Sequence, residues 1–170
     1  MEQIFNDFFS KIHLPHHTTV LNEGEIANKV FLIKKGCMRL FFYHEGKDIT
    51  FQFFFENDYV ASFDSLITHS PSSFYLETLE NTEALYISST DFLNIIKGNE
   101  KAHLLYENFL VNRFHEYQQL FLSRIRDTPQ KRYQLLLREH PEIIKRVPQH
   151  YIASYLGITP VSLSRIRSRY

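Results

Sequence analysis

The sequence predicts an α+β fold in which a β jelly roll is followed by one long helix and a C-terminal helix-turn-helix. Three observations lead to it: short apolar runs between residues 17 and 87, helical periodicity after residue 88, and a charge imbalance. Residues 1–100 carry seven Lys and Arg against fourteen Asp and Glu, whereas residues 101–170 carry twelve against five. The two parts of the chain therefore differ in both pattern and charge.

Length and composition favour a protein with one domain and a smaller second module, since the chain has 170 residues. It has no apolar run of the roughly 20 residues that cross a bilayer, and its first residues lack the pattern of a signal peptide. We therefore expect a cytoplasmic protein that does not bind membranes. The single cysteine, Cys37, excludes an internal disulfide and any metal site that needs several thiolates. We expect it to be a buried apolar residue.

The N-terminal part predicts a short helix and then a series of strands. Residues 2–12 place their Ile and Phe side chains at helical spacing, which predicts an amphipathic helix. The strand-like runs are separated by turn residues, and some are apolar on both faces, which is typical of a closed or doubly covered sheet. The predicted strands are Thr18–Leu21, Val30–Lys34, Cys37–Tyr43, Ile49–Phe55, Phe74–Leu79 and Ala84–Ile87.

Helical periodicity follows Ser88. A short helix is predicted to end at Gly98, and the absence of Pro and Gly over the next residues predicts one helix of roughly 27 residues, or about 40 Å. Thr128 and Pro129 then provide the N-cap and first position of another helix. We accordingly divide the chain into a β domain at 1–98, a long helix at 99–127 and a helix-turn-helix domain at 128–170.

The last 24 residues predict the helix-turn-helix. Ala153 is small where two helices would cross, and Gly157 can adopt the positive φ that ends the first helix. Thr159 and Pro160 provide the N-cap and first position of the second helix. The residues predicted to pack between the two helices are Ile152, Leu156, Leu163 and Ile166.

The outward face of the second helix is polar and basic, with no acidic residue after Glu142. A basic surface of this kind is expected of a module that binds nucleic acid. The alternative that stays open is an ordinary helical hairpin with a solvated basic face. The candidate DNA-binding residues are Thr159, Ser162, Ser164, Arg165, Arg167 and Arg169.

The long helix carries an apolar stripe made of Leu110, Phe114, Tyr117 and Phe121. Their 4-3-4 spacing is typical of a coiled-coil seam and predicts a parallel homodimer. The alternative is that the stripe packs only on the chain's own β domain.

Taken in order, these features resemble the Crp–Fnr family of transcription regulators. The resemblance rests on Glu23-Gly24-Glu25 before the strand that ends at Gly36, on Ile152–Thr159, and on Leu163-Ser164-Arg165. It implies a cyclic-nucleotide-binding-like jelly roll as sensor domain, a dimerisation helix, and a winged helix-turn-helix that binds double-stranded DNA. Because the chain stops near the second helix, we expect a short or absent wing. RNA polymerase is a further candidate partner.

The chain departs from the family pattern where relatives bind cyclic AMP. Ala61 replaces a Gly, Ser62 replaces the ribose-binding Glu, and Ser72 replaces the phosphate-pairing Arg. Without that Arg, a cyclic phosphate has no bidentate cationic partner. We therefore expect a pocket that binds an unidentified small-molecule effector other than cyclic AMP, or no ligand, and we expect no tightly bound cofactor. The candidate pocket residues are Ala61, Ser62, Phe63, Ser72 and Ser73.

No nucleophile–base pair, glycine-rich phosphate loop or pair of acids indicates an enzyme. His13, His16 and His17 lie close together, but the strands supply no further metal-ligand spacing, so we expect no metal site. The alternative function is a cupin-like barrel that binds or transforms a small molecule, with a helical tail for oligomerisation. Salt-sensitive binding to duplex DNA discriminates between the two hypotheses.

Overall fold

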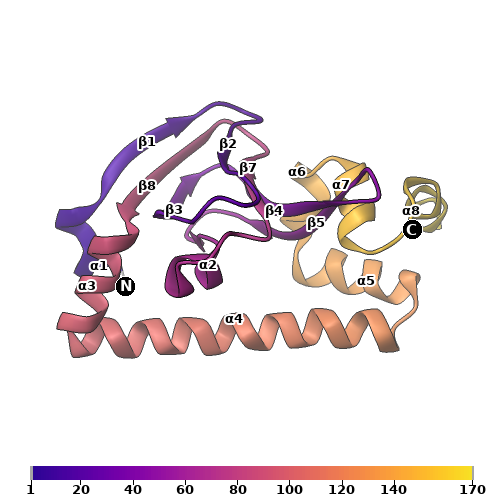
Figure 1. The fold of residues 1–170 in the computed structure, drawn as a ribbon. Helices are drawn as coiled ribbons and strands as arrows, with labels where there is room; N and C mark the ends of the chain where they lie inside the picture. The colour runs from indigo at the N-terminus through magenta and orange to yellow at the C-terminus, as the bar shows by residue number, and fades with distance from the viewer. Residues whose placement is uncertain (1, 170) are drawn as a thin grey trace. The chain divides into compact units, whose positions relative to one another are not determined.

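The computed structural model describes residues 2–169 (Figure 1). The chain divides into two compact units. The first contains the residues up to Phe42 together with Gln52–Val111, and the second contains Tyr43–Phe51 together with the residues from Asn112 on. The tip of one β-hairpin and the second half of the longest helix therefore belong to the same unit as the C-terminal helices.

Two four-stranded antiparallel sheets form the β domain, with strand orders β1-β8-β3-β6 and β2-β7-β4-β5. All six predicted strands are present, with ends shifted by one or two residues. The strands are β1 (Ser10–Leu14), β2 (Thr19–Leu21), β3 (Lys29–Lys35), β4 (Met38–His44), β5 (Lys47–Phe54), β6 (Tyr59–Val60), β7 (Tyr75–Thr78) and β8 (Thr82–Ser88).

The prediction of a helix over residues 2–12 was wrong beyond residue 8. The structure has α1 (Glu2–Phe5) and a 3₁₀ turn, η1 (Asn6–Phe8), after which the chain becomes strand β1. Ile12 pairs with Ala84 of β8, and Leu14 is buried. This pairing with a strand distant in sequence outweighs the local helical spacing of apolar residues. The sequence also gave no signal for β6 or for α2 (Phe63–Thr68).

Aromatic side chains pack the helices of the first unit against one another. The Ser88 hydroxyl caps α3 (Ser89–Gly98) by accepting from the Asp91 N–H at 3.0 Å. Phe92 of α3 lies 5.3 Å from Phe5 and 5.6 Å from Tyr106 of α4 (Glu100–Arg126), measured between ring centroids. Burial among these rings raises the pKa of Tyr106 to about 12.

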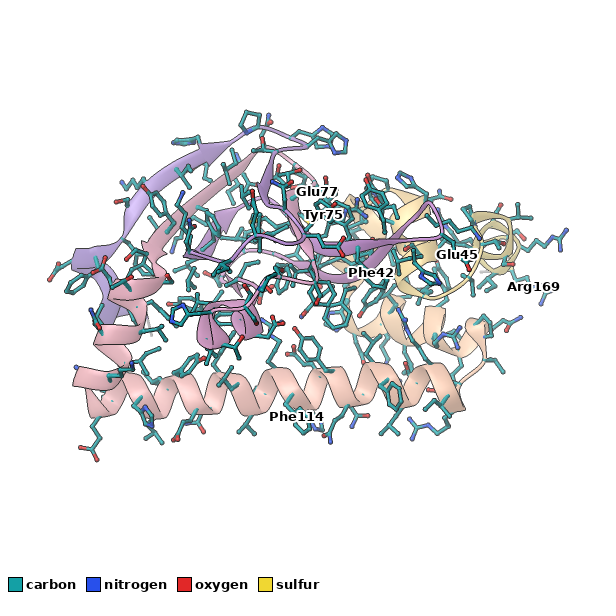
Figure 2. All side chains as sticks on the ribbon, in the orientation of Figure 1. Phe42, Glu45, Tyr75, Glu77, Phe114 and Arg169 are labelled. Atoms are coloured by element: carbon teal, nitrogen blue, oxygen red, sulfur yellow. The ribbon has the colours of Figure 1, made fainter. Side chains whose placement is uncertain are left out.

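A buried ion pair joins the two central strands of the second sheet. Arg39 of β4 lies opposite Glu77 of β7, and its Nε donates to Glu77 Oε1 at 2.7 Å. Both side chains are buried, and the guanidinium also lies 4.1 Å from the centre of the Phe41 ring. Figure 2 shows Glu77 beside Tyr75, whose ring stacks on Phe41. Because the desolvation of two buried charges offsets much of their attraction, this pair adds little net stability while both partners are present.

The long helix α4 (Glu100–Arg126) has the predicted length of 27 residues. Among residues 2–169, no helix, α4 included, has the sustained apolar run that a bilayer-spanning segment needs. Thr128 caps the next helix, as predicted, with its hydroxyl accepting from the Lys131 N–H at 3.3 Å. The remaining helices are α5 (Pro129–Glu139), α6 (Pro141–Arg146), α7 (Gln149–Tyr155) and α8 (Pro160–Arg167).

Candidate nucleic-acid interface and the cavity of the β domain

The turn between α7 and α8 is a Schellman motif. Gly157 has a φ of +67°, its N–H donates to Ser154 O at 2.9 Å, and the Ile158 N–H donates to Ala153 O at 3.0 Å. These two bonds satisfy carbonyls that the end of a helix leaves unpaired, and the left-handed backbone suits glycine. The turn therefore fixes the direction in which the chain leaves α7.

The start of α8 is capped as the sequence predicts. Thr159 Oγ1 accepts from the Ser162 N–H at 3.1 Å and lies 3.0 Å from the Ser162 hydroxyl, while Pro160 occupies the first position. The cap satisfies one of the free N–H groups at the helix start. Thr159 and Ser162, two of the candidate DNA-binding residues, thus have a local structural role as well.

The two faces of α8 differ sharply. Its inner face packs on α7 through the predicted apolar residues, and Ala153 is fully buried where the helices cross. On the outer face Ser164 and Arg165 are exposed, whereas Ser162 and Arg167 are half-buried. Arg169, in the turn that follows α8, is also exposed. Figure 2 shows Arg169 extending from the end of α8. The buried residues of this pair are Ile152, Ala153, Leu156, Leu163 and Ile166.

The exposed arginines of this face have no acidic partner among the residues that the structure describes. Neither Arg165 nor Arg169 forms an ion pair with another described residue. The acidic residues of α5 and α6 contact other side chains. Glu139 pairs with Arg138 at 2.7 Å, and Glu142 lies 3.3 Å from His140. A protruding helix with free guanidinium donors can enter a DNA major groove, which is about 12 Å wide.

Two arginines hold the C-terminal end of α7. Arg124 of α4 donates to Tyr155 O at 2.7 Å, and Arg132 of α5 donates to Leu156 O from Nε at 3.2 Å and Nη2 at 3.0 Å. These carbonyls form the negative end of the helix, where a cation is favourable. Burial raises the pKa of the Tyr155 hydroxyl and lowers the pKa of Arg124. Sequence reasoning missed both arginines, since their partners are distant in the chain.

The tip of the β4–β5 hairpin also contacts α7 within the second unit. Ser154 Oγ accepts from the Thr50 N–H at 2.8 Å and donates to Asp48 O at 3.1 Å. On the same hairpin, the Phe51 ring lies 5.1 Å from the ring of Tyr117 on α4. The hairpin, α4 and α7 therefore meet around the last turn of α7.

The apolar stripe of α4 is only partly the predicted one. Phe114 (marked in Figure 2) and Phe121 are exposed, at 61% and 64%, but Leu110 is half-buried and Tyr117 contacts Phe51. Other exposed apolar side chains continue the stripe at heptad-like spacing. They are Leu104, Val111 and Ile125.

Two of the predicted pocket residues meet in the β domain. The Ser72 hydroxyl donates to Ser62 Oγ at 2.9 Å, and the Ser62 hydroxyl donates to Asp64 Oδ1 at 2.8 Å. Both serines are buried, so their hydroxyls satisfy each other without a ligand. Phe63 contacts the aromatic side chains of α3 and α4 instead, and Ser73 is exposed.

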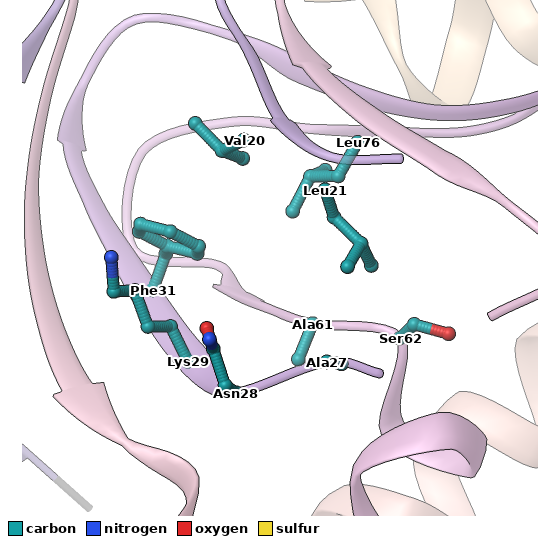
Figure 3. A pocket seen from close by; sticks show the side chains of 9 residues that line it. All are labelled: Val20, Leu21, Ala27, Asn28, Lys29, Phe31, Ala61, Ser62 and Leu76. Carbon is teal, nitrogen blue, oxygen red and sulfur yellow. The ribbon is translucent and has the colours of Figure 1, made fainter. Parts of the chain in front are cut away.

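A small cavity lies beside this pair, lined by Ala61 and Ser62 from the predicted set (Figure 3). Its interior volume is about 10 Å³, which holds about one water molecule. A drug-sized ligand needs several hundred Å³. Most of the remaining lining is apolar, with Lys29 as its one charged residue. Among residues 2–169 no three His, Cys, Asp or Glu side chains are grouped so that they could hold a metal ion.

Comparison with known families identifies this β domain. The sequence profile of the cyclic nucleotide-binding domain matches residues 11–99, slightly more than half of the chain. The chain belongs to the cyclic nucleotide-binding domain family. A comparison with curated protein sequences found no significant match to this chain.

Solved structures extend the likeness of this cyclic nucleotide-binding domain protein to nearly the whole chain. FixK2 from Bradyrhizobium japonicum has a TM-score of 0.81 at 16% identity, over 95% of this chain and 83% of its own. A transcriptional regulator of the Crp/Fnr family from Eubacterium rectale has 0.77 at 20%, over 99% and 81%. The c-di-GMP responsive global regulator CLP from Xanthomonas campestris has 0.75 at 15%, over 98% and 88%. These likenesses confirm the fold predicted from the Crp–Fnr resemblance.

The connection between α4 and α5 should depend on pH through Asp127. A hydrogen bond from Lys131 Nζ at 2.7 Å, with the charges of Lys131 and Arg126, lowers the pKa of the Asp127 carboxyl. Its contribution is therefore fully present above the ordinary carboxyl pKa of about 4 and is lost as the pH falls through the lowered value. Asp127→Asn should flatten the loss of unfolding free energy on acidification, measured by urea denaturation between about pH 3 and pH 7.

Some acid sensitivity should persist in this variant, because hydrogen bonds from Asn22 also lower the pKa of Glu25. A slope equal to that of the wild type would show that the Asp127 carboxylate does not stabilise the fold.

Proposed function

We propose that this protein is a homodimeric, sequence-specific DNA-binding transcription regulator of the Crp–Fnr type. The observation that carries the proposal is α8: its inner face packs on α7, its start is capped, and its outer face presents Arg165. Neither Arg165 nor Arg169, in the turn after α8, has an ion-pair partner among the described residues. A recognition helix needs this combination of rigid support and free donors. The fold shared with a Crp/Fnr-family transcriptional regulator supports it.

The parts of the proposed regulator follow the division predicted from the sequence: a sensor domain at 1–98, a dimerisation helix at 99–127 and a DNA-binding domain at 128–170. In the dimer, the exposed stripe of α4 around Phe114 and Phe121 meets its counterpart on a second copy. Two such copies would present two α8 helices to successive major grooves, with half-sites about one helical turn apart.

The effector of the sensor domain is a molecule other than cyclic AMP. A cyclic phosphate entering the pocket would have to break the hydrogen bond between Ser72 and Ser62, and it would gain no arginine in return. The lining beside the serines is mostly apolar, but the cavity there holds about one water molecule, so a larger effector would bind only if the pocket opened.

The experiment that tests the central proposal is a selection of bound sequences from random duplex DNA, followed by a salt titration of the selected site. A regulator of this kind enriches a symmetric site and binds it less tightly as salt rises. A cupin-like barrel with a helical tail would enrich no sequence.

RNA polymerase is a further proposed partner once the protein is bound to its DNA site.

Arg165→Ala should cost roughly 1–3 kcal/mol on the selected site and flatten the preference at one base pair, because Arg is the commonest bidentate partner of guanine. Arg169→Ala, the matched control, should weaken binding to all sequences alike and reduce the salt slope by about one, as expected for a phosphate contact. Fluorescence anisotropy on specific and random duplexes measures both effects. An unchanged ratio of specific to random binding in Arg165→Ala would exclude a base contact.

Exchanging Phe114 and Phe121 together for Glu should convert the dimer to monomers in sedimentation velocity, since four like charges would be placed in an apolar seam. Leu137→Glu is the control, because Leu137 is exposed at 41% but lies on α5, away from the stripe. If the double variant still sedimented as a dimer, the seam would have to lie elsewhere.

Cyclic AMP should give no binding heat at micromolar concentrations in titration calorimetry, because Ser62 and Ser72 take the places of its acidic and cationic partners. Saturable micromolar binding would overturn this account of the pocket.

A further inference from the structure

Val161 is an apolar side chain at an unexpected place. It lies at the second position of α8 and is 61% exposed. Its neighbours on the outer face are polar or cationic, namely Ser164 and Arg165. Single exposed apolar residues are common on protein surfaces, so exposure alone assigns it no role. Its position on the helix gives a second reason to ask what it contacts.

The stability of α8 does not account for a valine there. Its β-branched side chain loses rotamer freedom in a helix. The first turn of a helix favours acidic residues, and the first turn of α8 has none. Because Val161 is also exposed, it adds little to the packing between α7 and α8. A role for it must therefore come from a contact outside the chain.

The spacing places Val161 on the same face as Arg165, one helical turn earlier. Four residues correspond to about 6 Å along the helix, whereas successive base pairs lie about 3.4 Å apart. The two side chains can therefore reach base pairs that are one or two steps apart. Val161 is at the N-terminal end of α8, the end whose residues contact bases in helix-turn-helix proteins.

We propose that Val161 contacts the C5-methyl group of a thymine one or two base pairs from the guanine contacted by Arg165. This methyl is the one apolar group that the major groove presents, so it is the natural partner of an apolar side chain on a polar recognition face. The inference rests on the proposed DNA-binding function and adds a second specificity-determining residue to it.

Replacing thymine by deoxyuridine tests the contact, because this exchange removes only the methyl group. In the full-length protein on its selected site, one deoxyuridine per half-site removes two methyls from the dimer's site. Wild-type binding should weaken about ten- to twenty-five-fold, the product of about three- to fivefold for each buried methyl. Val161→Ala, whose shorter side chain reaches the methyl less well, should lose clearly less affinity on this exchange. Exchange of any other thymine should weaken wild type and Val161→Ala alike. A cytosine at this position should bind better when it is 5-methylated, again more so with Val161 present.

Leu137→Ala, which alters an exposed apolar residue on α5, is the matched control and should keep the wild-type response to deoxyuridine. Circular dichroism checks that Val161→Ala retains its helices. Equal losses in wild type and Val161→Ala, or a selected site without thymine near the guanine, would overturn the inference while leaving DNA binding intact. Failure to select any DNA sequence would instead overturn the proposed function.

Discussion

The position of α8 depends on how α7 ends. The last carbonyls of α7 accept hydrogen bonds from Arg124 and Arg132, and the next turn is closed by the Gly157 and Ile158 N–H groups. Charged donors at the negative end of a helix make stronger hydrogen bonds than neutral ones. Since α8 begins three residues after Gly157, a change in the backbone conformation of this turn would change the direction of α8 and of its outer face.

The same point receives the contacts of the β4–β5 hairpin. The Ser154 hydroxyl forms two hydrogen bonds with the hairpin backbone: it donates to Asp48 O and accepts from the Thr50 N–H. The chain passes between the two compact units at three places only, after Phe42, after Phe51 and after Val111. Two of these crossings are the strands of the hairpin and the third is in α4. The hairpin and α4 therefore link the two units covalently, and both also bond α7, the hairpin through Ser154 and α4 through Arg124.

The parts of this arrangement that sequence reasoning predicted are the ones with local causes. The caps at Thr128 and Thr159 and the positive φ of Gly157 depend on residues within a few positions, so they are visible in the sequence. Strand β1 was missed because its pairing partner β8 is about 70 residues away. The bonds from Arg124 and Arg132 span 31 and 24 residues, and nothing in the local pattern signals them. For the candidate pocket, the resemblance identified Ser62 and Ser72, but the direction of Phe63 depends on an aromatic cluster that only the fold assembles.

Composition also overstates the charge that faces outward from the C-terminal part. Twelve Lys and Arg follow residue 100, but several of them are bound within the protein. Arg124 and Arg132 donate hydrogen bonds to backbone carbonyls, and Lys131 and Arg126 form ion pairs with Asp127. Among residues 2–169, Arg165 and Arg169 differ from these residues in having no acidic partner rather than in residue type. The positive charge available for the proposed DNA contact is therefore smaller than the composition suggests. Since phosphate contacts carry no sequence information, preference for one site would have to come from base contacts.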